Sequence, residues 1–109
     1  MQNGCPKMKL SVEYNPEFFN DLVQVVDWYN EIQAGLGDKF FNKVKKQTAR
    51  LSISARLFAV KYDDVRCMNI EKFPYVVHYC INEQTLTVKV EALFHAGRNP
   101  EIWYERIIK

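Results

Sequence analysis

The fold is decided by residues 66–103, which read RCMNIEKFPYVVHYCINEQTLTVKVEALFHAGRNPEIW. Residues 86–95 alternate between apolar and mixed side chains, and this period of two predicts a strand with one buried face. Residues 75–82 alternate in the same way, and Asn82-Glu83-Gln84-Thr85 supplies the turn between the two strands. The stretch therefore predicts an antiparallel meander that ends in a polar loop over residues 95–100.

The first part of the chain predicts a strand followed by a helix. Met8–Tyr14 alternates like a short strand, and Asn15-Pro16 marks the start of a helix. Asn accepts a backbone N–H at an N-cap, and Pro at the first helical position has no N–H to leave unpaired. The helix is expected to bury one apolar stripe. The stripe consists of Phe18, Leu22, Val25, Tyr29 and Ile32, with Phe19 and Val26 beside it.

A second helix is predicted from Asp38 to Ser54. Gly35-Leu36-Gly37 ends the first helix, because glycine takes positive φ without steric cost. So short a turn makes the two helices an antiparallel hairpin. The expected apolar face of the second helix comprises Leu36, Phe40, Val44 and Leu51, with Phe41 and Thr48 beside it.

Two further strands complete the predicted sheet. Leu57–Tyr62 and Val65–Lys72 flank a turn at Asp63-Asp64. Phe73-Pro74-Tyr75 ends the second of them, because proline cannot donate a hydrogen bond within a sheet. The predicted fold is α+β: an N-terminal strand, an antiparallel helical hairpin packed on an antiparallel β-meander, and a short C-terminal helix.

Length and composition predict one domain over residues 1–109. Hydrophobic residues make up 48% of the chain, enough for a real core. No apolar run approaches the roughly 18 residues that a membrane span needs. The N-terminal residues contain no apolar segment typical of a signal peptide, so a cytoplasmic protein is expected. Cys5, Cys67 and Cys80 fit neither a disulfide framework nor a zinc pattern, and we expect small, partly buried side chains.

The net charge of +2 is unevenly distributed. Residues 13–35 contain five acidic residues and no basic one, whereas residues 36–62 contain seven basic residues against Asp38 alone. At helical spacing, part of the basic set forms one stripe, which is either a solvated face, a phosphate contact or a contact for an acidic protein partner. The stripe consists of Lys39, Lys43, Lys46 and Arg50.

The residues that could perform chemistry lie in the last third of the chain. Arg66 is predicted to lie on the same face of its strand as Met68 and Ile70. On that face its side chain either pairs with a carboxylate or carbonyl group or contacts a phosphate. His95 shares the Lys89 side of its strand, the less buried side, where it is either a general acid–base or a structural hydrogen-bonding group. His78 is expected to be a packing residue.

A ribonuclease that works without a metal needs a base, a cation for the phosphorane charge and an acid. Arg66, His95, Arg98 and Tyr104 include the right side-chain types, and only the fold could bring them together. The sequence contains no pattern typical of metal ligands, a P-loop, a dinucleotide site or a Ser-His-Asp triad, so no metal or cofactor is expected.

An ordered set of residues resembles the RelE/ParE superfamily of toxins from bacterial type II toxin–antitoxin systems, which includes plasmid stabilisation proteins. The resemblance extends from about Met8 to about Arg106. The set comprises Gly35-Leu36-Gly37, Phe40, Arg66, Phe73-Pro74-Tyr75, Tyr79, and His95-x-x-Arg98-x-Pro100-x-x-Trp103.

The resemblance implies the predicted fold and one of two activities. RelE-like members cleave messenger RNA on the ribosome without a metal, whereas ParE-like members inhibit DNA gyrase and are not nucleases. Both kinds are neutralised by a co-encoded antitoxin. Arg98 and Tyr104 match an Arg–Tyr pair of the nucleases. Cys67, Asn69 and Val76 stand where the nucleases carry Lys, Lys and Arg.

We therefore expect a toxin, with inhibition of gyrase favoured over cleavage of ribosome-bound messenger RNA. A member that only binds an antitoxin is the third possibility. The antitoxin is expected to dock partly on Lys39, Lys43, Lys46 and Arg50 and to cover the mouth of the sheet.

Overall fold

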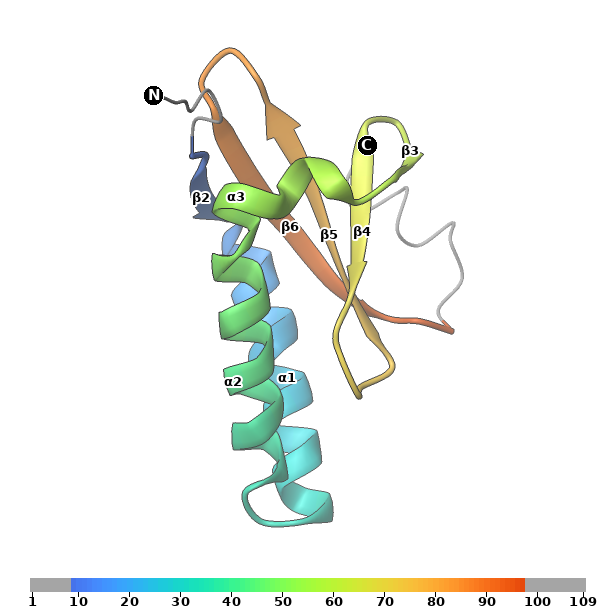
Figure 1. The fold of residues 1–109 in the computed structure, drawn as a ribbon. Coiled ribbons are helices and arrows are strands. Elements are labelled where there is room, and N and C mark those ends of the chain that lie inside the picture. The colour runs from blue at the N-terminus through green and yellow to red at the C-terminus, as the bar shows by residue number, and fades with distance from the viewer. Residues whose placement is uncertain (1–8, 98–109) are drawn as a thin grey trace.

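The computed structural model describes residues 9–97, and two long helices in it lie against a curved sheet (Figure 1). The short C-terminal helix predicted from the sequence falls outside the described residues. The elements are β2 (Ser11–Tyr14), α1 (Pro16–Ile32), α2 (Leu36–Ala49), α3 (Leu51–Ser54), the 3₁₀ helix η1 (Ala55–Leu57), β3 (Val60–Tyr62), β4 (Val65–Asn69), β5 (Tyr75–Asn82) and β6 (Thr87–His95).

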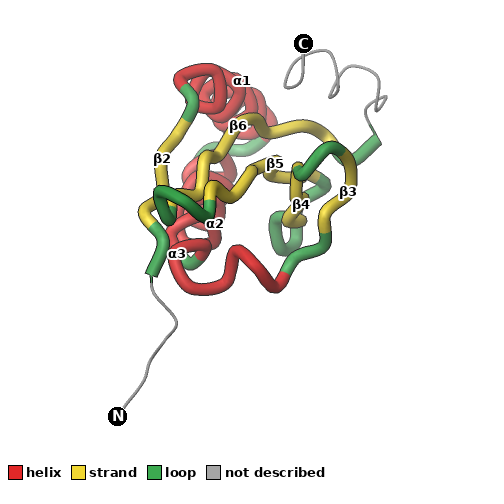
Figure 2. The backbone as a smooth tube through the Cα atoms, turned by 90° about the horizontal axis from the view of Figure 1, so that it is seen from above, coloured by secondary structure: helices red, strands yellow, loops and turns green. Residues whose placement is uncertain are grey.

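The five strands form one sheet in the order β2-β6-β5-β4-β3, which Figure 2 shows from above. Strands β3 to β6 pair antiparallel, which confirms the predicted meander. Strand β2 pairs parallel to β6, from Ser11 opposite Thr87 to Tyr14 opposite Val90, so the whole sheet is mixed. A parallel pair needs a long crossover connection, and the helical hairpin begins the connection that leads away from β2.

The start of α1 follows the prediction. Asn15 is the N-cap, its side chain accepts a hydrogen bond from the Glu17 N–H at 2.9 Å, and Pro16 is the first helical residue. Phe18, Leu22 and Tyr29 are buried. Phe19 and Ile32, which the sequence placed in or beside the buried stripe, are largely exposed. For Ile32 the reason is visible in Figure 1, where the connected ends of α1 and α2 extend past the sheet.

A glycine does not cap the end of α1, contrary to the prediction, because α1 ends at Ile32 with Gln33 as an extended C-cap. Gly35 is instead the N-cap of α2, and Leu36 and Gly37 already belong to that helix. Gly35 has φ 89°, and Gly37 packs so tightly that an added Cβ would lie 2.2 Å from the Val26 carbonyl oxygen. The Asn30 side chain accepts a hydrogen bond from the Gly37 N–H at 2.7 Å. Helix α2 begins two positions before the predicted start.

The predicted second helix is interrupted at Arg50, where α2 gives way to the short α3. The bend carries the chain across the end of the sheet and places Leu51 and Ala55 in the core. Phe40 and Val44 are buried as predicted, as is Thr48, whereas Phe41 is exposed.

A β-bulge divides β6 into two halves, and the alternation of side chains between the two faces of the sheet shifts by one residue at the bulge. Ala92 lies opposite His78 and Val90 opposite Tyr79, so Glu91 is an extra residue without a partner on β5. Before the bulge, Val88 and Val90 face the helices, and after it Leu93 does. The prediction that His95 shares a face with Lys89 is therefore wrong, because the bulge moves His95 to the helix face beside Tyr75.

The opposite face of the sheet, the far face, carries a second set of buried side chains. Alternation along the strands and the cross-strand pairs place Cys67, His78 and Ala92 there in one row. His78, Ala92 and Phe94 are all buried. The other far-face residues used below are Tyr62, Asn69, Val76, Cys80 and Lys89.

Candidate functional site

Arg66 lies on the helix face of β4 with its guanidinium group directed at backbone carbonyls. Its Nη1 donates hydrogen bonds to the carbonyl oxygens of Phe58 and Arg56. On the neighbouring strand, Tyr79 is the cross-strand partner of Arg66, and its hydroxyl donates to the Ala55 carbonyl at 2.7 Å. Two adjacent side chains thus bind three carbonyl oxygens in η1 and at its C-cap residue. Of the alternatives that the sequence left open for Arg66, the structure shows hydrogen bonding to carbonyl groups.

His95 lies at the exposed end of β6. Its ring packs edge-on against Tyr75, with centroids 5.2 Å apart, and its Nδ1 accepts the Gly97 N–H at 3.0 Å. In the neutral ring this bond leaves the hydrogen on Nε2.

The structure does not bring Arg66 and His95 together. Arg66 aligns with Tyr79 on β5, and His95 aligns with Tyr75. At ~3.3 Å per strand residue, these two positions on β5 are about 13 Å apart. Arg66 and His95 also lie on strands that flank β5 from opposite sides. Arg98 and Tyr104, the other predicted catalytic residues, lie outside the described residues.

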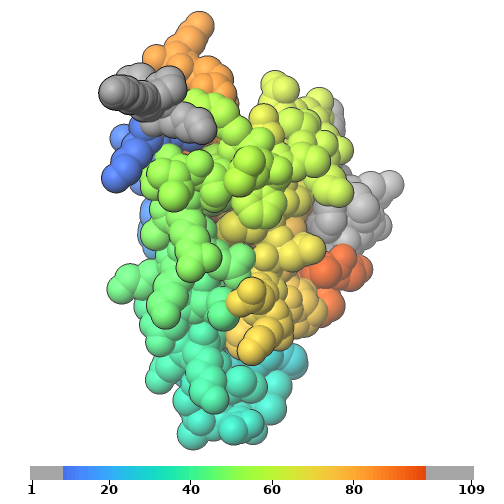
Figure 3. Space-filling model, viewed as in Figure 1, coloured from blue at the N-terminus to red at the C-terminus, as the bar shows by residue number. Residues whose placement is uncertain are grey.

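The predicted basic stripe lies along the outer surface of α2. It borders a cleft of about 430 Å³ between α2 and the β4–β5 connection. Lys43 Nζ lies 2.9 Å from Glu71 Oε1 across this cleft. Figure 3 shows the two walls side by side. We call it the lysine cleft; its lining residues are Lys39, Asn42, Lys43, Lys46, Lys72 and Phe73.

Sequence reasoning missed Lys72 because residues 65–72 read as one strand. Strand β4 ends at Asn69, and Lys72 lies in the turn that follows, with φ 71°. Pro74 ends the predicted strand only after Lys72, and the sequence carries no signal for the earlier end at Asn69. Arg50 belongs to the stripe but does not line the cleft.

The far face holds a cluster of neutral polar groups. The Tyr62 hydroxyl and His78 Nδ1 are 2.9 Å apart, and Cys67 Sγ is 3.5 Å from the same nitrogen. Burial lowers the pKa of His78 to about 4 and raises the pKa of Cys67 to about 11. Burial also raises the pKa of the Tyr62 hydroxyl. At neutral pH the thiol is protonated and the imidazole uncharged, so Cys67 is not an activated nucleophile.

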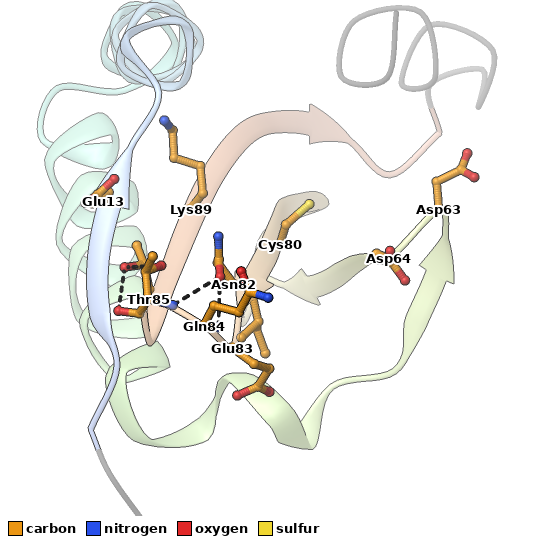
Figure 4. A pocket seen from close by; sticks show the side chains of 11 residues that line it. Glu13, Asp63, Asp64, Cys80, Asn82, Glu83, Gln84, Thr85 and Lys89 are labelled. Atoms are coloured by element: carbon orange, nitrogen blue, oxygen red, sulfur yellow. Dashed lines mark hydrogen bonds between the residues drawn. The ribbon is translucent and has the colours of Figure 1, made fainter.

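Next to this cluster the far face opens into an acidic cleft of about 810 Å³. Figure 4 shows Glu13 on one side of the cleft and Asp63 and Asp64 on the other. Four carboxylates, those of Glu13, Asp63, Asp64 and Glu83, line it together with a single ammonium group, that of Lys89. Glu83 is paired with Arg56 at 2.7 Å, so the net negative charge of the cleft comes from the other three carboxylates against Lys89, and it disfavours phosphate. Cys80, also in the lining, has a pKa raised to about 11, chiefly by burial.

An apolar groove of about 220 Å³ runs between β2, α1 and α2. Phe19 and Phe41, which were expected beside the buried stripes, line it with exposures of 47% and 41%. At its floor the Tyr14 and Thr48 hydroxyls are 2.9 Å apart. The groove is a surface suited to an apolar protein segment.

Within residues 9–97, no three His, Cys, Asp or Glu side chains gather closely enough to hold a metal ion. None of the helices in that range has the length and apolar character of a membrane span.

No family model matches the chain, and no curated protein matches it. Solved structures do. A chain of the chromosomal ParDE TA (toxin–antitoxin) system of P. aeruginosa has a TM-score of 0.72 at 15% identity, covering 81% of this chain and 97% of that one. The isolated E. coli RelE toxin has a TM-score of 0.61 at 15% identity, with 88% and 93% covered.

A substituted E. coli RelE in complex with an antitoxin RelBc peptide has a TM-score of 0.60 at 12% identity, covering 94% of this chain and 98% of that one. These similarities confirm the predicted α+β fold as that of the RelE and ParE toxins.

Proposed function

We propose that this chain is the toxin of a type II toxin–antitoxin module and that it acts by binding a protein, DNA gyrase, rather than by cleaving RNA. The fold supports the toxin assignment. The charge of the far face is the observation that carries the choice of mechanism.

A metal-independent ribonuclease needs cations around the scissile phosphate. At the three strand positions where the resemblance would put Lys, Lys and Arg, the far face has Cys67, Asn69 and Val76. The adjoining cleft has four carboxylates and one ammonium group, and only one of the carboxylates, that of Glu83, is paired with an arginine, Arg56, among the ion pairs of residues 9–97. The only histidine buried on this face, within the described residues, has a pKa lowered to about 4, so it is a poor proton donor and acceptor at neutral pH. A face of this kind favours contact with a protein over contact with RNA.

Arg66 is assigned a structural role in this proposal. Its guanidinium group is occupied by carbonyls of the η1 region and lies on the helix face. It therefore positions the segment that leads into β3, and it does not face the acidic cleft.

The antitoxin is the second partner, and the apolar groove supports it. Phe19 and Phe41 expose aromatic surface on two adjacent helices, which an amphipathic segment could cover. One of the similar structures, that of E. coli RelE, holds an antitoxin peptide. A Phe19→Asp, Phe41→Asp variant should no longer bind the antitoxin encoded by the neighbouring gene. The control is Val23→Asp, at an exposed position of α1 outside the groove, which should still bind it.

Two assays on the purified full chain test the mechanism. In a gyrase supercoiling assay we expect inhibition, and unchanged supercoiling at a large molar excess of protein would overturn the proposal. In a translation reaction with a defined messenger, mapped by primer extension, we expect no cleavage. Cuts confined to ribosome-bound codons would assign the RelE-like activity instead and make His95, Arg98 and Tyr104 the catalytic candidates.

Growth on expression without the antitoxin completes the test. We expect growth arrest, and an Arg98→Ala, Tyr104→Phe double variant should arrest growth as strongly as the natural sequence. Loss of arrest in this soluble, folded variant would support a nuclease. Normal growth with the natural sequence would identify a protein that only binds an antitoxin.

A further inference from the structure

We propose that the lysine cleft binds the phosphate backbone of a single-stranded nucleic acid, with Phe73 as a platform for a base. The inference goes beyond the proposed function and does not depend on it, since the cleft lies on α2 and the β4–β5 connection, away from the far face.

The cleft concentrates positive charge on two walls. Lys39, Lys43 and Lys46 stand on α2, where the helical rise places them about 6 and 4.5 Å apart along the axis. Lys72 contributes a fourth ammonium from the opposite wall. Compact, strongly hydrated lysine ammonium groups suit phosphates as point charges.

Glu71 does not prevent the lysine ammonium groups of the cleft from binding a phosphate. It pairs with Lys43, but the two side chains are 68% and 32% exposed, and exposed ion pairs of this kind contribute little. A phosphate can therefore displace the Glu71 carboxylate. Lys39, Lys46 and Lys72 have no carboxylate within ion-pair distance among residues 9–97.

The two walls are held in place without a ligand. The Gln47 side chain donates to the Asn69 carbonyl at 3.0 Å and accepts the Glu71 N–H at 2.8 Å. These bonds fasten the β4–β5 connection to α2, so binding does not have to order the cleft.

Phe73 favours nucleic acid over an acidic protein segment. Its ring packs edge-on against Tyr29 and Phe40, with centroids 5.3 and 4.9 Å away, and remains partly exposed in the cleft. A fixed aromatic ring between lysines provides the stacking surface and charged groove that single strands use without sequence preference. An acidic peptide would use the ammonium groups but has no need of the ring.

The test measures fluorescence anisotropy of a labelled oligo-dT with the purified full chain. Three to four phosphate contacts predict that affinity falls ~20- to 50-fold between about 50 and 200 mM salt. A Lys39→Ala, Lys46→Ala variant should lower the magnitude of the log–log salt slope by about 1.4. The matched control is Lys45→Ala, Lys61→Ala, which removes the same charge outside the cleft and should leave the slope unchanged.

A Phe73→Leu variant distinguishes base stacking on the aromatic ring from the phosphate contacts of the lysines. We expect weaker binding with the salt slope retained, in a variant whose circular dichroism is native. The proposal is overturned if oligo-dT does not bind at low salt, or if the control variant lowers the slope as much as the cleft variant. It is also overturned if poly-glutamate displaces oligo-dT at equal charge concentration, because the occupant is then an acidic polypeptide.

Discussion

A carboxylate oxygen of Asp21 in α1 accepts a hydrogen bond from the backbone N–H of Leu93 in β6 at 3.1 Å. Strand β2 ends at Tyr14, opposite Val90, so beyond that point α1 lies beside β6 in place of a strand. The Asn15 side chain also donates to Glu91, the bulge residue, at 3.0 Å. The first turns of α1 therefore hold the bulge that sets the direction of His95.

Replacing Asp21 should destabilise the fold. Asp21→Ala leaves the Leu93 N–H without its acceptor, and we expect a loss of about 1–2 kcal/mol in the free energy of unfolding. Urea denaturation measures it. Asp21→Asn retains an acceptor oxygen and should lose less, and Asp27→Ala, at an exposed position of the same helix, should be nearly neutral. Equal losses for Asp21→Ala and Asp27→Ala would contradict the role assigned to Asp21.

Gly35, in the turn between the helices, and Gly37, in the first turn of α2, should differ in their tolerance of a side chain. Gly37→Ala places a Cβ 2.2 Å from the Val26 carbonyl oxygen, and forcing the helices apart should cost about 1–3 kcal/mol. Gly35 has open space around it, and Asn tolerates its positive φ, so Gly35→Asn should cost less. Thermal unfolding of the two variants decides between them, and a Gly37→Ala protein as stable as the natural one would refute the close approach.

Stability should fall as the pH is lowered from 7 to 5, and His78 should be a main cause. Burial lowers its folded pKa to about 4, against 6.5 as its ordinary value. In this window the unfolded chain binds the proton and the folded chain does not, so stability rises with pH. The full shift in the His78 pKa corresponds to about 3 kcal/mol in the free energy of unfolding, and only part of this stability is lost by pH 5.

A His78→Leu variant should lose this part of the pH dependence, as measured by urea denaturation at each pH. Its absolute stability also changes, because the Tyr62 and Cys67 contacts are removed, so the slope with pH is the informative quantity. His95→Gln alters an exposed ring and is the control. If the free energy of unfolding depends on pH as steeply in His78→Leu as in the natural sequence, other groups cause the pH dependence.

Arg66 and Tyr79 should be coupled in stability. Tyr79→Phe leaves the buried Ala55 carbonyl without its donor and should cost about 1–2 kcal/mol, and Arg66→Met should cost a similar amount. Since both side chains hold η1, a double-mutant cycle should give an interaction energy of about 0.5 kcal/mol or more.

Growth arrest distinguishes this structural role of Arg66 from a catalytic one. At a temperature where Arg66→Met remains folded, we expect arrest as strong as with the natural sequence. Tyr79→Phe, matched in stability, is the control. Loss of arrest in Arg66→Met alone would assign the guanidinium group to the functional site.

Local sequence signals predicted much of this fold because they act over a few residues. Asn15-Pro16 fixes a helix start through one side-chain bond, and Asn82 fixes a turn by accepting the N–H groups of Gln84 and Thr85. The Asp63-Asp64 turn formed with both residues at positive φ. Each of these arrangements depends on neighbours in the chain.

The features that the sequence did not predict depend on distant contacts. Alternation in β6 continues through Glu91 without a break, so the bulge and the face of His95 are invisible until β5 and α1 are in place. Phe19 and Phe41 have the spacing of buried residues but lie outside the helix–sheet contact. Lys72 joins the lysine cleft only because β4 ends early.

The pairing of β2 with β6 also constrains how this protein is made. Asn15 and Glu91, which join the start of α1 to β6, are 76 positions apart, so every residue up to Glu91 must leave the ribosome before this part of the fold can close. Contacts of such long range slow folding and leave apolar surface exposed in the meantime. A nascent chain that ends before β6 has the amphipathic helices but no finished sheet beneath them. Premature termination should therefore yield a chain for degradation and not a partly active protein.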